Sequence, residues 1–136
     1  MPQGTMEKQW NVRIEKEIAQ KWKPQPLDAK KKIYSIDTPP PYPSGRPWHI
    51  GAAAHYSQID MIARTSRMQG FSVFFPLGID RNGLPVEHYT EKKYNIKMQE
   101  TPREKFVALC AKALDELEAE MIQTMKDMGL SCDYKN

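Results

Sequence analysis

Residues 33–55 read IYSIDTPPPYPSGRPWHIGAAAH, and this stretch decides the fold. Its first part, Ile33–Asp37, alternates large β-forming side chains with small or polar ones, a pattern typical of a strand. Five of the 11 prolines of the chain then fall between Pro39 and Pro47, where fixed φ angles and missing N–H groups exclude both helix and sheet. A helix is expected to begin near Trp48–His49. The stretch therefore predicts a strand, a stiff extended loop and a helix, in that order.

A second strand and loop follow this helix. Its apolar side chains repeat at helical spacing, and Gly70 supplies a C-terminal stop; the repeat consists of Ile50, Ala54, Met61, Ile62, Thr65 and Met68. Ser72–Phe75 is bulky enough for a short strand buried on both faces. The loop over residues 76–85 carries an Asn-Gly turn signal and ends at Pro85, which suits the first position of a helix over residues 86–95.

Strand, helix and strand in this order form a βαβ unit, which implies a parallel sheet with a right-handed crossover helix. The predicted fold class is α/β, the N-terminal half of a Rossmann-like nucleotide-binding fold preceded by an N-terminal helix. That helix is expected over residues 6–23, where Trp10, Ile14, Ile18 and Trp22 recur every fourth residue. We expect residues 1–30 to form a helical extension and residues 31–136 the truncated half-domain. Two strands do not make a stable open sheet, which predicts a part of something larger.

The last predicted helix has the clearest pattern. Thr101-Pro102-Arg103-Glu104 has the residue types of a capping box, with Thr101 as the N-cap and proline at the first helical position. Gly129 supplies the stop. The expected apolar stripe consists of Phe106, Cys110, Ala113, Leu114, Leu117, Met121, Met125 and Met128.

Composition excludes several classes of protein. The 136 residues include 20 basic and 17 acidic side chains, and a net charge of +3 does not by itself indicate nucleic acid or an anionic membrane as a partner. No apolar run approaches the ~20 residues of a membrane span, and the N-terminus lacks the apolar core of a signal peptide. Cys110 and Cys132 are isolated and predict no zinc site and no disulfide scaffold. We therefore expect a cytoplasmic protein with no membrane partner and no metal ligands of its own.

Two side chains at the predicted strand ends have the chemistry of a binding site. His49 lies at a helix N-terminus, where an imidazole can donate to a phosphate; a capping or surface role is the alternative. Gly51 would let a flat ring lie on the backbone. Asp80 follows a buried strand in a glycine-containing loop and is placed to face a cation; an Asx turn or a helix cap is the alternative. Open parallel sheets bind ligands at this edge.

These residues resemble a known family. IDTPPPYPSGRPWHIGAAAH (residues 36–55) and DMIARTSRMQGFSVFFPLGIDRNGLPVE (residues 60–87) are similar to the catalytic domain of class I aminoacyl-tRNA synthetases for branched aliphatic amino acids, most of all the archaeal-type valyl branch. The resemblance implies ATP-dependent activation of valine, with Mg²⁺ accompanying the ATP, and ligation of valine to tRNA(Val). It implies that His49 is catalytic and contacts the ATP phosphates.

The resemblance also implies the remaining site residues. The family signature that begins His49-Ile50-Gly51 binds ATP, so His49, Gly51 and Ala52 are expected to contact the nucleotide. Pro39, Pro40 and Pro41 would form a wall of the amino-acid pocket, and Asp80 would bind the α-ammonium group of the substrate. No residue is expected to hold a metal.

The sequence departs from the family pattern in two ways. Ala52 replaces the final histidine of the signature, and one extra residue lies between Gly45 and His49. The family's Lys-Met-Ser-Lys-Ser loop, editing insertion and anticodon-binding helices have no counterpart here, so a missing C-terminal part is an expected partner. A leucyl or isoleucyl identity, and a non-catalytic synthetase-like module that binds nucleotide or RNA, stay open as alternatives.

Overall fold

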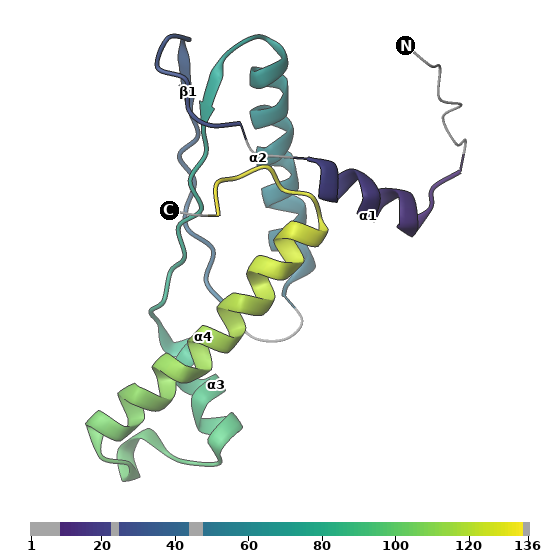
Figure 1. The fold of residues 1–136 in the computed structure, drawn as a ribbon. Helices are drawn as coiled ribbons and strands as arrows, with labels where there is room; N and C mark the ends of the chain where they lie inside the picture. The colour runs from purple at the N-terminus through teal and green to yellow at the C-terminus, as the bar shows by residue number, and fades with distance from the viewer. Residues whose placement is uncertain (1–8, 23–24, 44–47, 135–136) are drawn as a thin grey trace.

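The computed structural model describes residues 9–22, 25–43 and 48–134. Gly45, next to the extra residue expected before His49, lies outside these ranges, as do residues 6–8 and 23 of the helix expected over residues 6–23. The elements follow the predicted order: α1 (Val12–Lys21), β1 (Ile33–Ser35), α2 (Ile50–Met68), β2 (Ser72–Phe74), α3 (Leu84–Tyr94), a 3-10 turn (Met98–Glu100) and α4 (Arg103–Asp127). In Figure 1, α2 runs beside β1 and β2, α4 crosses from α3 back toward α2, and α1 projects to one side.

The two strands are parallel, as predicted, with Ile33 opposite Ser72 and Ser35 opposite Phe74. A segment that the sequence did not predict to pair lies beside the chain just after β2. Pro76 and Asp133 form an isolated parallel bridge, in which Asp133 N–H donates to the Phe75 carbonyl at 2.8 Å. The chain therefore returns after α4 to the carboxyl end of β2.

The buried face of α2 is its polar face. It consists of Tyr56, Asp60, Ala63 and Ser66, which recur every third or fourth residue. The apolar repeat that predicted the helix lies on the exposed side, where Ile50 is 80% and Met68 is 88% exposed. Ala63 is fully buried, and its small side chain suits close packing of α2 against the sheet.

Helix α4 buries most of its predicted stripe: Phe106, Ala113, Leu114, Leu117, Met121 and Met125. Cys110 is only partly buried and Met128 is exposed. The predicted capping box is wrong, because Pro102 is the N-cap and the Thr101 hydroxyl donates back to the Lys97 carbonyl at 2.7 Å. The predicted end of α4 is confirmed, since Gly129 has a φ of +74°, a conformation that favours glycine.

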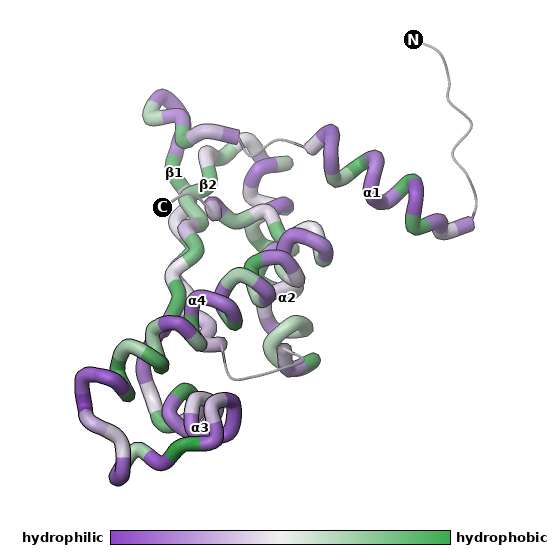
Figure 2. The backbone as a smooth tube through the Cα atoms, turned by 60° about the horizontal axis from the view of Figure 1, so that its bottom comes forward, coloured by the Kyte–Doolittle hydropathy of each residue, from purple (hydrophilic) through white to green (hydrophobic). Residues whose placement is uncertain are grey.

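Helix α1 is amphipathic, as predicted, and alternates hydrophilic and hydrophobic positions along its length (Figure 2). None of its residues is buried, and Trp10 is 77% exposed. The Asn11 side chain caps the helix by accepting the Arg13 N–H at 2.8 Å. Among the described residues, no helix is both long enough and apolar enough to cross a bilayer.

Candidate active site

The loops that follow β1 and β2 meet at the carboxyl edge of the sheet. Asp80 N–H donates to the Pro41 carbonyl at 2.9 Å, across 39 positions of sequence. A Cβ built on Gly78 would lie 3.6 Å from the Pro40 Cβ, which is ordinary contact distance. The structure therefore brings the proline loop and the Asp80 loop together, as a shared amino-acid site would require.

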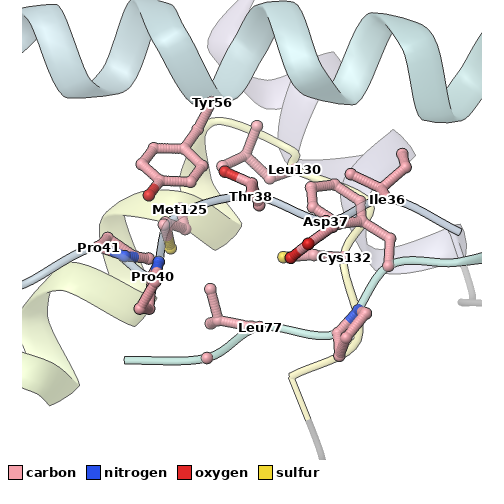
Figure 3. Close-up of a pocket in the computed structure, with 13 residues that line it drawn as sticks. Ile36, Asp37, Thr38, Pro40, Pro41, Tyr56, Leu77, Met125, Leu130 and Cys132 are labelled. Carbon is pink, nitrogen blue, oxygen red and sulfur yellow. The ribbon is translucent and has the colours of Figure 1, made fainter. Parts of the chain in front are cut away.

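Behind these loops lies a cavity of about 260 Å³ (Figure 3). This is just below the ~300–1,000 Å³ of sites for drug-sized molecules, so the cavity suits a smaller ligand. Pro40 and Pro41 line it, whereas Pro39 and Asp80 are outside its lining. The full lining is largely apolar and consists of Ile36, Asp37, Thr38, Pro40, Pro41, Tyr56, Phe75, Pro76, Leu77, Gly78, Met125, Leu130 and Cys132.

Tyr56 of α2 forms part of the cavity wall, and the sequence did not single it out. Its hydroxyl donates to the Pro39 carbonyl at 2.5 Å, and its ring stacks on Trp48 with centroids 5.8 Å apart. The side chain is buried, and burial raises the pKa of its phenol above the ordinary value. The only signal in the sequence was an aromatic residue on the polar face of a helix.

His49 is the N-cap of α2, which was the alternative considered for it. Its Nδ1 accepts the Gly51 N–H at 3.0 Å, so the proton of the neutral ring is on Nε2. The ring is exposed, and Nε2–H is a donor suited to an anion. A Cβ on Gly51 would lie 2.9 Å from the His49 ring, so any larger residue at this position would displace the imidazole. Ala52 is partly buried in the same first turn, where its N–H donates to the His49 carbonyl at 3.0 Å.

Asp80 forms an Asx turn, in which its Oδ1 accepts the Asn82 N–H at 3.0 Å. The next residue anchors the loop to α4, because the Arg81 guanidinium contacts Asp115 and Glu118, each at 2.5 Å. The Asx turn was the alternative reading of Asp80. It leaves a partly buried carboxylate beside the proline loop, where a cation can approach.

The far wall of the cavity comes from the segment after α4. Leu130 and Cys132 line the cavity, and Ser131 between them is bonded to Asp60 of α2. Burial raises the pKa of the Cys132 thiol, which keeps this wall uncharged. Sequence reasoning missed this wall, although Leu130, Cys132 and Tyr134 alternate with polar residues as a strand does.

No three His, Cys, Asp or Glu side chains within the described ranges converge to hold a metal ion. A Mg²⁺ ion needs oxygen ligands in octahedral geometry and commonly takes several from water and substrate phosphates. The donors among residues 9–22, 25–43 and 48–134 do not make a site for Mg²⁺ by themselves.

Comparison with known proteins identifies the family. The family described as tRNA synthetases class I (I, L, M and V) matches residues 7–136. The chain is 44% identical over 140 residues to valine–tRNA ligase of Aeropyrum pernix, covering 94% of this chain and 17% of that protein. For the enzyme of Pyrobaculum aerophilum the identity is 42%, over 92% and 16%. The chain is 47% identical to the enzyme of Archaeoglobus fulgidus, and the match covers 79% of this chain and 12% of that protein. The chain thus spans 12 to 17% of the length of these relatives, and with a match over residues 7–136 it belongs to the class I tRNA synthetases.

Proposed function

We propose that this chain is the first half of the catalytic domain of a valine–tRNA ligase. Within the longer cytoplasmic protein it activates valine with ATP and serves the transfer of valine to tRNA(Val). Residues 31–136 then form the half-domain and residues 1–30 a helical extension. The observation that carries the proposal is the hydrogen bond between Asp80 N–H and the Pro41 carbonyl beside a small apolar cavity.

The reaction needs positioning more than covalent help from the protein. A carboxylate oxygen of valine attacks the α-phosphorus of ATP. The bond between the α-phosphorus and the oxygen that bridges it to the β-phosphorus breaks, and pyrophosphate leaves with the electron pair of that bond. Valyl-adenylate is then attacked by a tRNA hydroxyl and releases AMP. Donors aimed at the phosphorus oxygens stabilise the transition state, and each lost donor costs about 3 kcal/mol.

Each site residue has a part in this proposal. Asp80 binds the α-ammonium group, and the walls at Pro40 and Pro41 pack against the side chain of valine. His49 donates from Nε2 to the ATP phosphates, while Gly51 and Ala52 leave room for the nucleotide over the first turn of α2. Pro39 shapes the pocket through its carbonyl. A Mg²⁺ ion that accompanies the ATP would offset part of the negative charge of its phosphates.

Two other functions have observations in their favour. Isoleucine and leucine differ from valine by one methylene, and a hydrophobic pocket distinguishes one methylene by only 10- to 200-fold, so a leucyl or isoleucyl identity is the same-class alternative. Ala52 in place of the last signature histidine favours a module that binds nucleotide or RNA without catalysis. Such a module would bind ATP but form no adenylate.

Amino-acid-dependent ATP–pyrophosphate exchange tests the proposal. The longer protein that contains this chain is assayed with valine, isoleucine, leucine and threonine separately, and with His49→Ala and Asp80→Ala. We expect valine to support the fastest exchange and both substitutions to reduce it at least 100-fold. A folded protein that binds ATP but shows no exchange with any of these amino acids would contradict the proposal and favour the module.

A further inference from the structure

We propose that Tyr56 is a positioning residue that fixes the proline wall of the amino-acid pocket, and that its hydroxyl thereby sets the preference for valine over larger side chains. This inference rests on the proposed function. Tyr56 is not assigned a contact with ATP or with the reacting atoms. It acts through the Pro39 carbonyl.

The chemistry of the proline loop leaves its carbonyl oxygens as the points at which the rest of the fold can anchor it. Pro39, Pro40 and Pro41 have no N–H groups, so their carbonyl oxygens are their only backbone hydrogen-bonding atoms. Two of these carbonyls are bonded to other parts of the fold: Tyr56 Oη donates to Pro39 at 2.5 Å and Asp80 N–H donates to Pro41 at 2.9 Å. The Asp80 bond comes from a loop, whereas the Tyr56 bond comes from the rigid helix α2.

The ring of Tyr56 has a second role that its hydroxyl does not share. It is 7% exposed, lines the cavity directly and stacks on Trp48, the neighbour of His49. A substitution that removes only the hydroxyl therefore loosens the proline wall but keeps the stacking of the ring on Trp48, which supports the region around His49. A substitution that removes the ring disturbs both parts of the site. The two effects are separable by comparing the KM for valine with the KM for ATP.

The chain provides a matched control. Tyr134 is partly buried, and its hydroxyl donates to a backbone carbonyl, that of Leu130, at 3.1 Å. It packs against the same core cluster but makes no bond to the proline loop. Tyr134→Phe thus removes the same kind of hydrogen bond, and any loss common to both phenylalanine variants is a general effect on stability.

The experiment measures ATP–pyrophosphate exchange and thermal unfolding for the full-length wild type, Tyr56→Phe, Tyr56→Leu and Tyr134→Phe. We expect Tyr56→Phe to raise the KM for valine about three- to tenfold with the KM for ATP unchanged, because one neutral hydrogen bond is lost. The ratio of kcat/KM for valine to that for isoleucine should fall by a similar factor, since a relaxed wall admits one more methylene. Tyr56→Leu should raise both KM values, and Tyr134→Phe neither.

Two results overturn the inference in distinguishable ways. An inactive wild type contradicts the proposed function, and this inference fails with it. An active wild type in which Tyr56→Phe matches Tyr134→Phe in the KM for valine and in the valine-to-isoleucine ratio contradicts the inference alone.

Discussion

The carboxylate of Asp60 accepts two hydrogen bonds from Ser131, one from the backbone N–H at 2.8 Å and one from the hydroxyl. Asp60 lies in the middle of α2 and is only 5% exposed. Arg64 completes the cluster, because its Nε contacts the same carboxylate at 2.6 Å. Ser131 lies between two residues of the cavity wall, so this pair holds that wall against the helix.

Asp60→Asn should destabilise the fold. An amide keeps one acceptor oxygen but loses the charge that faces Arg64 and strengthens both bonds from Ser131. We expect the free energy of unfolding to fall by about 2–3 kcal/mol in urea titrations of the longer protein that contains this chain. Asp127→Asn, at an exposed position, should change it by less than about 0.5 kcal/mol. Equal effects of the two variants would show that the Asp60 cluster contributes nothing special.

Thr90→Val should stabilise the fold. Thr90 is fully buried in α3, and its hydroxyl has no hydrogen-bond partner among the described residues. Valine has nearly the same shape and removes the cost of burying that group, so the free energy of unfolding should rise by about 1 kcal/mol. The control is Thr124→Val on exposed α4 surface, where a hydroxyl bonded to the Glu120 carbonyl is lost. A loss of stability in Thr90→Val would refute the prediction.

His49→Asn should separate capping from catalysis. Asparagine is a good N-cap, so the free energy of unfolding of His49→Asn, measured by thermal unfolding, should stay within about 0.5 kcal/mol of the wild-type value. That of His49→Ala should fall by about 1 kcal/mol. Neither variant has an imidazole donor, so both should reduce pyrophosphate exchange about 100-fold. Exchange restored by asparagine would mean that His49 acts only as the cap of α2.

Stability should fall in alkali. Burial raises the pKa of Cys132, Tyr56 and Tyr134 above their unfolded values of 9.0 for the thiol and 10.0 for the phenols. Below about pH 9 both states keep these protons and stability does not depend on them; above it the unfolded chain releases protons first. The free energy of unfolding in urea should therefore decrease from about pH 9 to about pH 10.5. Tyr134→Phe should make the decrease shallower, and a flat profile would contradict the assignment.

The sequence alone determined the order and type of the elements, because near neighbours decide them. Alternation made Ile33–Ser35 a strand, missing N–H groups kept Pro39–Pro41 out of the sheet, and glycine conformations ended α2 and α4. The motifs after the two strands indicated where a site would lie, since carboxyl ends of parallel strands share one edge. Asp80 and Pro41 do meet there.

Only the tertiary structure decided which faces are buried. Asp60 can lie inside because Ser131, 71 positions away, supplies the hydrogen bonds that a buried carboxylate requires. Tyr56 became a pocket residue because its hydroxyl donates to the Pro39 carbonyl, 17 positions earlier in the sequence. Asp133 formed a bridge with Pro76 because the chain after β2 offered backbone groups that could accept from it and donate to it. Each of these outcomes depends on a partner distant in sequence, and local patterns contain no information about such partners.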